Sequence, residues 1–204
     1  MTRPRAQTRI QQKNSEAILE AALEVFSQSG FRGATLDQIA EKAGLSKPNL
    51  LYYFPSKEAI HAALIAGLLK VWLDPLRELD AGGEPVEEIL AYVRRKLQLS
   101  RDFPRESRLF ANEILQGAPR ILEAITGELK PLVDEKSAVI AKWMAEGRLA
   151  PLEPHHLIFS IWATTQHYAD FDVQVRAVLG HEDDRHFSQA EEALVILYRR
   201  TLTP

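Results

Sequence analysis

Apolar residues recur every three or four positions along almost the whole chain. In the first segment, Ile18, Ala22 and Val25 share one face of a helix predicted over residues 14–29, which Gly30 and Gly33 end. No segment shows the alternation typical of a β-strand, and no internal repeat is present. The pattern therefore predicts an all-α fold.

Two short helices follow within residues 35–54. Thr35 suits the N-cap of the first, and Gln38 three residues later completes a capping box. Gly44 suits a left-handed C-cap. Ser46 caps the second helix, which runs to residue 53 with Pro48 in its first turn, where a missing N–H costs nothing. The turn of three residues between them favours the steep crossing of a helix-turn-helix.

The remainder of the chain is also predicted to be helical. The expected helices cover residues 56–73, 85–101, 104–116, 119–146, 155–178 and 184–201. Pro75 should bend or close the first of these helices. Gly127 and Pro131 weaken the case for residues 119–146 as one uninterrupted helix.

The second short helix has polar side chains on its outer face that suit DNA. Such side chains contact phosphates and base edges, and the N-terminal residues of a recognition helix lie nearest the bases. Thr35 and Lys57 stand at the N-termini of two helices, where backbone N–H groups favour an anion. The candidate DNA-binding residues are Thr35, Lys47, Pro48, Asn49, Tyr52, Tyr53 and Lys57. A helical corner without any DNA partner would show similar spacing.

The distribution of charge favours a polyanionic partner at one end of the chain. Residues 1–60 hold eight Lys and Arg against six Asp and Glu, whereas the remainder holds 17 against 22. Arg3, Arg5, Arg9 and Lys13 form a basic arm without any acid. Such an arm suits DNA, although a solvated tail would have the same composition.

Composition narrows the class of protein. The chain has 204 residues, enough for a sizeable core, and no cysteine, which excludes disulfides and thiolate metal sites. No apolar run is expected to approach the roughly 18 residues of a membrane span. The polar start carries no export signal, and so a cytoplasmic protein is expected.

Residues 35–59 resemble the DNA-binding signature of the TetR family of transcriptional regulators. The matching positions are Thr35, Ile39, Ala40, residues 43–46, Leu50, residues 52–54 and residues 56–59. Pro48 stands where glycine is frequent in the family, and Tyr53 where histidine is frequent. The resemblance implies an N-terminal three-helix DNA-binding domain over residues 1–56, followed by a helical effector-binding and dimerisation domain over residues 57–204.

The C-terminal half resembles the uracil-responsive, pyrimidine-utilisation branch of the same family. Residues 107–119, 134–143 and 156–171 carry this likeness. It implies a pocket for a small-molecule effector, uracil or a related nucleobase, and a homodimer formed by the last two helices. Ala111 and Asn112 stand where a more apolar pair is usual, and so a regulator of another pathway with a different effector is the alternative.

A flat, polar heterocycle needs aromatic walls and a few hydrogen-bonding groups. Trp72, Trp162 and Tyr168 are the candidate walls, and the amides of Asn112 and Gln166 are suited to an amide edge. Each of these residues would also be ordinary in a helical core.

The last two helices carry the stripes expected at a subunit interface. The stripes consist of Phe159, Trp162, Gln166 and Asp170 in one helix, and Ala193, Leu194, Leu197 and Tyr198 in the other. The family likeness favours a partner-facing role for them, and a plain core is the alternative.

Other clusters of polar residues suggest no metal or cofactor. His155 and His156 are adjacent and point about 100° apart on a helix. His181 and His186 flank an acidic run that suits the start of the last helix. The run from Arg94 to Lys96 is expected to be a solvated helix face.

These features together favour a dimeric repressor that binds a palindromic DNA operator and is controlled by a small molecule. An enzyme is the rival class, but the chain has no H-E-x-x-H, G-x-S-x-G or phosphate-binding glycine loop. A helical adaptor that binds only protein is the third possibility, and it would give the basic arm no purpose.

Overall fold

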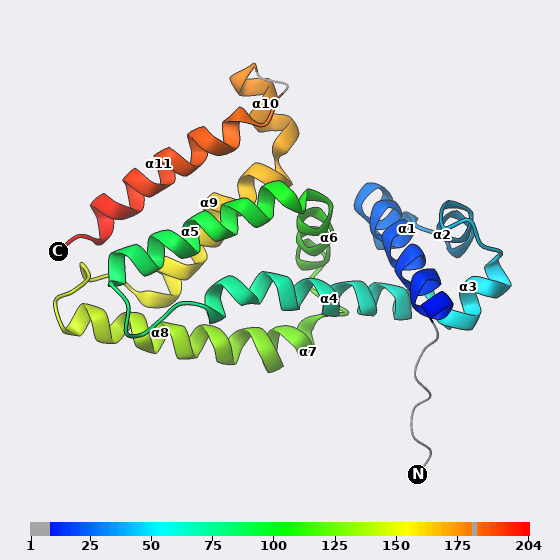
Figure 1. Cartoon of the computed structure of the whole chain (residues 1–204), viewed down its shortest axis with the longest axis horizontal. Coiled ribbons are helices and arrows are strands. Elements are labelled where there is room, and N and C mark those ends of the chain that lie inside the picture. The colour runs from blue at the N-terminus through cyan, green and yellow to red at the C-terminus, as the bar shows by residue number, and fades with distance from the viewer. Residues whose placement is uncertain (1–8, 181–182) are drawn as a thin grey trace, which may run out of the picture.

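The computed structural model describes residues 9–180 and 183–204, and this part of the chain is helical and contains no strand (Figure 1). Arg3 and Arg5 of the basic arm, and His181, lie outside the described residues. The helices are α1 (Arg9–Gly33), α2 (Leu36–Lys42), α3 (Lys47–Tyr53), α4 (Lys57–Arg77), α5 (Pro85–Asp102), α6 (Pro104–Leu115), α7 (Leu122–Ala124), η1 (Ile125–Leu129), α8 (Lys130–Ala145), α9 (Pro154–Asp170), α10 (Asp172–Leu179) and α11 (Arg185–Leu202).

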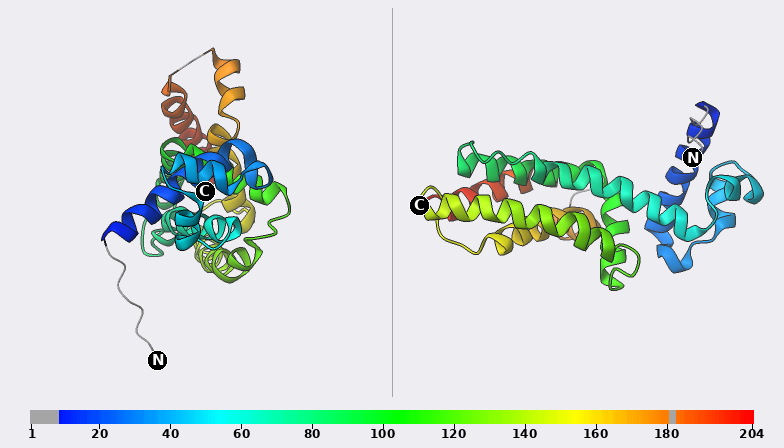
Figure 2. Two further views of the ribbon diagram at one scale, coloured as in Figure 1. Left: turned by 90° about the vertical axis from the view of Figure 1, so that its right-hand side faces the viewer. Right: turned by 90° about the horizontal axis from the view of Figure 1, so that it is seen from below.

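Helices α1, α2 and α3 form a small unit at one end of the molecule (Figures 1 and 2). Their core includes Phe26, Ile39 and Leu50, all fully buried or nearly so. Helix α1 begins at Arg9 and ends at Gly33, so it is longer at both ends than predicted. Its kink falls at Gly30, whose φ of +65° is a conformation that glycine adopts without strain.

Helix α4 connects this unit to the larger group of helices. The hydroxyl of Ser56 caps it by accepting a hydrogen bond from the N–H of Ala59 at 3.1 Å. The helix continues through Pro75 and ends at Arg77, two residues later. Pro75 has no N–H to donate to the carbonyl four residues earlier, so one helical hydrogen bond is missing in this last turn. Ile60 packs in the core of the N-terminal unit, whereas Leu76 packs in the second core.

By length and composition alone, α4 meets the criteria for a membrane-crossing helix, with a hydropathy of 1.4 over its most apolar window. The expectation that no apolar run approaches this length is therefore not met. Half of that window is buried inside the structure, which is typical of a core helix.

Helices α5, α8, α9 and α11 enclose the second core, which lies away from the N-terminal unit (Figure 2). Helix α5 packs against both α9 and α11. Trp143 is almost completely buried here, and its indole N–H donates to the carbonyl of Ala81 at 3.2 Å. This contact holds the loop between α4 and α5 against α8.

Two predicted long helices are broken. The single helix expected over residues 155–178 ends at Asp170, because Phe171 leaves helical geometry, and α10 follows as a separate helix. The helix expected over 119–146 is divided into α7, η1 and α8, with Pro131 in the first turn of α8. The break within residues 119–146 was expected from Gly127 and Pro131. No glycine or proline marks the break at Phe171.

Candidate DNA-binding face and effector cavity

Side-chain caps hold α2 and α3 in place. The Thr35 hydroxyl accepts from the N–H of Gln38 at 3.2 Å, and the Gln38 side chain accepts from the N–H of Thr35 at 2.9 Å. These two hydrogen bonds confirm the predicted capping box. Gly44 adopts the expected left-handed conformation with φ of +67°, and Ser46 caps α3.

The outer side of α3 is open to solvent. Thr35, Lys47, Pro48, Asn49 and Tyr52 are exposed, whereas Tyr53 and Lys57 are half-buried. Tyr52 is 70% exposed although it is a large aromatic residue. An exposed aromatic beside a lysine and an amide suits contacts with phosphates and base edges.

We call the surface formed by Thr35, Lys47, Pro48, Asn49, Tyr52 and Tyr53 the α3 face, and three of its polar side chains have partners within the same unit. Lys47 pairs with Asp37 at 2.9 Å. Gln11 donates to the Tyr52 hydroxyl at 3.1 Å, and Asn14 donates to the Tyr53 hydroxyl at 2.8 Å. Helix α1 thus orients both tyrosines.

The ammonium group of Lys57 makes hydrogen bonds within the protein. Its Nζ donates to the carbonyls of Phe31 and Ala34 at 2.7 and 2.6 Å, and it lies 4.5 Å from the centroid of the Phe31 ring. The structure therefore ties α4 to the junction between α1 and α2 through this residue.

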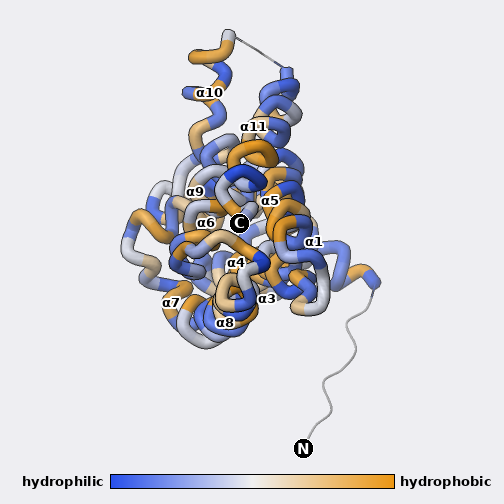
Figure 3. The backbone as a smooth tube through the Cα atoms, turned by 90° about the vertical axis from the view of Figure 1, so that its left-hand side faces the viewer, coloured by the Kyte–Doolittle hydropathy of each residue, from blue (hydrophilic) through white to orange (hydrophobic). Residues whose placement is uncertain are grey.

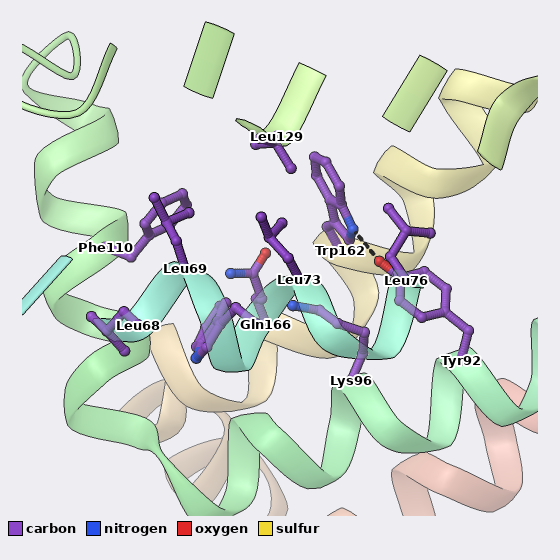
Figure 4. Close-up of a pocket in the computed structure, with 11 residues that line it drawn as sticks. Leu68, Leu69, Leu73, Leu76, Tyr92, Lys96, Phe110, Leu129, Trp162 and Gln166 are labelled. Atoms are coloured by element: carbon purple, nitrogen blue, oxygen red, sulfur yellow. Dashed lines mark hydrogen bonds between the residues drawn. The ribbon is translucent and has the colours of Figure 1, made fainter. Parts of the chain in front are cut away.

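A cavity of about 500 Å³, part of it open to solvent, lies among α4, α5, α6, η1 and α9 (Figure 4). Three of the predicted ligand-binding residues, Trp72, Trp162 and Gln166, line it although they are far apart in sequence. The remaining lining residues are Leu68, Leu69, Leu73, Leu76, Tyr92, Lys96, Phe110 and Leu129.

Two other candidates lie elsewhere. Asn112 lines a neighbouring groove between α6 and the end of α9, and Gln166 borders both that groove and the cavity. Tyr168 packs against His186 and Phe187, with ring centroids 6.4 and 6.2 Å away. The structure thus places Asn112 in a groove that shares Gln166 with the cavity, whereas Tyr168 lines neither of them.

The two tryptophans of the cavity differ in whether the indole N–H makes a hydrogen bond. Trp162 donates its N–H to the hydroxyl of Tyr92 at 2.6 Å, as Figure 4 shows. Burial raises the pKa of Tyr92, so this hydroxyl stays protonated. The N–H of Trp72 is buried and has no hydrogen-bond partner among the described residues. An unpaired buried donor in a cavity wall suits a ligand acceptor.

Lys96 is a functional candidate that the sequence analysis missed. It was expected on a solvated face, but it is only 3% exposed and its amine points into the cavity (Figure 4). The expectation is wrong because Lys96 falls at helical spacing after Ile89, Tyr92 and Val93, on the buried face of α5. Spacing was thus the signal, and the charge of the side chain obscured it.

The amine of Lys96 lies 4.2 Å from the centroid of the Trp72 ring. Burial lowers its pKa from 10.5 to about 7, and the negative charge of Asp170 acts in the opposite direction. The cavity therefore contains one group that changes charge near neutral pH.

A buried ionic cluster joins the effector-domain helices to the N-terminal unit. Arg120 pairs with Glu113 of α6 at 2.7 Å and stacks 3.6 Å from the centroid of the Phe31 ring of α1. His61 of α4 lies 3.6 Å from Glu113. Burial lowers the pKa of His61, whereas the negative charge of Glu113 acts to raise it. Phe110, which lines the cavity, is three residues before Glu113 on the same helix.

The outer surfaces of α9 and α11 leave apolar side chains exposed, among them Phe159, Ile196 and Leu197. Leu194 and Tyr198 of the predicted interface stripe are instead buried in the second core. Hydrophobic and hydrophilic residues alternate along α10 and α11 in Figure 3. Only part of the predicted stripe is therefore available to a partner.

Within residues 9–180 and 183–204, no group of three or more His, Cys, Asp or Glu side chains is arranged to hold a metal ion. His155 contacts Glu153 and Asp134 at 3.0 and 3.2 Å, and this contact explains its position without a metal.

Comparison with known proteins identifies both parts of the chain. Residues 18–64 match the profile of "Bacterial regulatory proteins, tetR family", and residues 65–204 match "YcdC-like protein, C-terminal region". The chain is 55% identical over 179 residues to the HTH-type transcriptional regulator RutR of Escherichia coli K12, with 87% of this chain and 84% of RutR covered. It is 30% identical over 145 residues to an uncharacterized HTH-type regulator of Xanthobacter autotrophicus, with 70% and 68% covered.

Solved structures share the fold. A TetR-like transcriptional regulator from Rhodococcus superimposes with a TM-score of 0.68 at 21% identity, covering 96% of this chain and 97% of that one. The fatty acid degradation regulator FadR of Bacillus halodurans gives 0.66 at 20% identity, covering 96% and 95%. The two family profiles and the identity to RutR show that this chain belongs to the TetR family of transcriptional regulators, which bind DNA, respond to ligands and are not enzymes.

Proposed function

We propose that this regulator binds a palindromic operator as a homodimer, through the α3 face, and that uracil or a closely related nucleobase in the cavity releases it. The observation that carries the proposal is the meeting of Trp72, Trp162 and Gln166 around one cavity, beside α4. The identity to RutR, a regulator of pyrimidine utilisation, supports the choice of nucleobase. We place the protein in the cytoplasm, where it meets DNA.

The chemistry of the cavity suits a small planar ring with an amide edge. The indoles of Trp72 and Trp162 and the ring of Phe110 offer flat apolar surfaces. The Gln166 amide has one carbonyl and one NH₂, so it can pair with adjacent N–H and C=O groups of a pyrimidine. The unpaired N–H of Trp72 supplies one further donor.

Two helices connect the cavity with the DNA-binding unit. Helix α4 lines the cavity in its second half, and its first half packs in the core of the N-terminal unit. Helix α6 carries Phe110 at the cavity and Glu113 at the contact with Arg120. A ligand that prefers one arrangement of these helices changes the balance between DNA-binding and released states, because only differential affinity shifts such an equilibrium.

The exposed apolar residues of α9 and α11 support a homodimer. A two-fold axis would place two copies of α3 on one side of the DNA, about 34 Å apart for successive major grooves. The operator of such a dimer is a palindrome.

Selection from random DNA duplexes, followed by sequencing, would test the operator. We expect enriched palindromes whose half-sites are one helical turn apart, and a dimer in analytical ultracentrifugation. Enrichment of single half-sites would contradict the dimeric arrangement.

Fluorescence anisotropy with a selected duplex, at fixed salt, would test the effector. We expect uracil to weaken operator binding at least tenfold and adenine to leave it unchanged, because adenine has no ring carbonyl to accept from the donors of the cavity. If uracil leaves operator binding unchanged while another metabolite weakens it, the protein is a TetR-family regulator of another pathway.

A further inference from the structure

The amine of Lys96 is buried in the cavity wall without an acceptor. The residue is 3% exposed, and its Nζ lies over the Trp72 ring at 4.2 Å. Among the described residues, Nζ has no hydrogen bond and no ion pair beside this contact with the Trp72 ring, and it borders the cavity. Burying an ammonium group without an acceptor costs free energy, so burial favours the neutral amine and the group loses its proton more easily.

The charged surroundings of Lys96 offer only partial compensation. From α9, Asp170 faces it beyond ion-pair distance, and this carboxylate already accepts from the buried Ser107 hydroxyl of α6 at 2.5 Å. Arg108 of α6 and His167 of α9 also act on Asp170. Burial raises the pKa of Asp170, which weakens its compensation further.

The other elements around Lys96 add no opposite charge. Helix α4 contributes the Trp72 ring, η1 contributes Leu129, and α5 itself contributes Tyr92, whose hydroxyl accepts from Trp162. On α11, Glu191 pairs with Arg94 at 3.6 Å. The acceptor for the Lys96 amine is therefore expected from a ligand.

We propose that Lys96 makes effector binding proton-linked: the ligand places a ring carbonyl oxygen against the amine, and the complex takes up a proton that the empty cavity lacks. This inference rests on the proposed function, because it assigns the nucleobase to this cavity. It specifies the ligand class as an oxo-substituted pyrimidine. An amino group at the contacted position would present N–H donors to the ammonium group, so cytosine, which has one ring carbonyl instead of two, should bind more weakly than uracil.

The linkage has a defined pH range. With a pKa of about 7, the amine of the empty cavity is roughly nine-tenths protonated at pH 6, half protonated at pH 7 and one-tenth protonated at pH 8. A carbonyl acceptor stabilises the ammonium form and raises this pKa in the complex. The dissociation constant of uracil therefore rises about tenfold between pH 6 and pH 8.

Isothermal titration calorimetry of the full-length protein with uracil tests this inference. Titrations at pH 6, 7 and 8, each in two buffers of different ionisation enthalpy, give the number of protons taken up. We expect little proton uptake at pH 6 and an increase toward one proton per site at pH 8. Cytosine, in which an amino group replaces one of the two ring carbonyls, is titrated under the same conditions and should bind more weakly.

Two substitutions at Lys96 distinguish the effect of its positive charge from the effect of its gain and loss of a proton. Lys96→Met should bind uracil with equal affinity at pH 6 and pH 8 and without proton uptake. Lys96→Arg keeps a permanent positive charge and should likewise take up no proton. Lys142→Met, which removes an exposed lysine from α8, is the matched control and should behave like the wild-type protein.

Each outcome of the titrations decides between the two proposals. Uracil binding without proton uptake in the wild-type protein, or unchanged uptake in Lys96→Met, overturns the proton linkage and leaves the proposed effector standing. The absence of uracil binding at all three pH values overturns the proposed effector, and the linkage with it.

Discussion

The polar groups of the α3 face and those of the effector cavity differ in exposure and in hydrogen bonding. On the α3 face, Lys47 and Tyr52 are exposed, and each has a partner in the same unit. In the cavity, the Lys96 side chain and the N–H of Trp72 are buried, and no hydrogen-bond acceptor is found for either in the described part of the chain. Both regions are binding sites in the proposed function, but they are prepared for their ligands differently.

The difference has an energetic reason. An exposed ion pair contributes only about 0–1 kcal/mol, so DNA phosphates can replace the partner of Lys47 at small cost. A buried group without a partner costs about 1–3 kcal/mol, so the empty cavity is less stable than a filled one. DNA binding thus exchanges contacts, whereas effector binding supplies contacts that are missing.

Replacement of Lys96 should have the largest effect on stability. Lys96→Met should stabilise the empty protein by about 1–4 kcal/mol, because it replaces a buried charge by an apolar chain of similar length. Lys47→Met, the matched change on the α3 face, should alter stability by less than about 0.5 kcal/mol. Thermal and urea unfolding measure both.

The stabilisation by Lys96→Met should also depend on pH. Folding lowers the pKa of this lysine from 10.5 to about 7, so the unfolded chain binds more protons between these values. The stability of the wild-type protein should therefore rise with pH across this range, and Lys96→Met should lack that rise. A destabilised Lys96→Met protein would show that the amine is satisfied in the empty cavity.

Gln166 should affect effector binding and leave DNA binding unchanged. Gln166→Leu removes both hydrogen-bonding groups of the amide and should weaken uracil binding by about 1–3 kcal/mol, or roughly 5- to 150-fold. Gln98→Leu changes an exposed glutamine of α5 and is the control. Calorimetry measures uracil affinity and anisotropy measures operator affinity. A parallel loss of both affinities in Gln166→Leu would indicate a structural role instead.

The elements near the α3 face were predictable because their signals are local. Thr35, Gln38 and Gly44 fix the ends of α2 through contacts within a few residues. The break at Phe171 has no such signal. Periodicity continues across it, and Asp170 is held by Ser107, which is 63 positions earlier in the chain. Long-range contacts of this kind are not visible in one sequence.

The cavity was predictable only in part for the same reason. The sequence analysis selected aromatic and amide residues on apolar helices, and Trp72, Trp162 and Gln166 do meet. It had no means of telling that Asn112 points to a neighbouring groove, because this depends on how α6 packs against α9. Lys96 was expected to be exposed because its side chain is charged, although its helical spacing places it on the buried face of α5.

Tyr52 should contribute directly to operator binding. Tyr52→Ala removes an exposed ring from α3 and should weaken operator binding about tenfold, or about 1.4 kcal/mol, with the dimer intact. Tyr52→Phe removes only the hydroxyl that accepts from Gln11 and separates its contribution from that of the ring. Gel-shift titrations at fixed salt measure the affinity. Unchanged affinity in Tyr52→Ala would remove this residue from the DNA-binding surface.

Thr35 should show a smaller effect that arises from folding. Thr35→Ala removes the hydroxyl that accepts from the N–H of Gln38, so α2 loses its cap and stability should fall by about 1 kcal/mol. Thr35→Ser retains a capping hydroxyl and should restore most of that stability. If Thr35 also contacts a phosphate, operator binding should fall in Thr35→Ala even at low temperature, where both variants are folded, and recover in Thr35→Ser. Equal operator affinities for all three proteins would confine this polar group of the α3 face to its structural contact with Gln38, in contrast to the unpaired groups of the cavity.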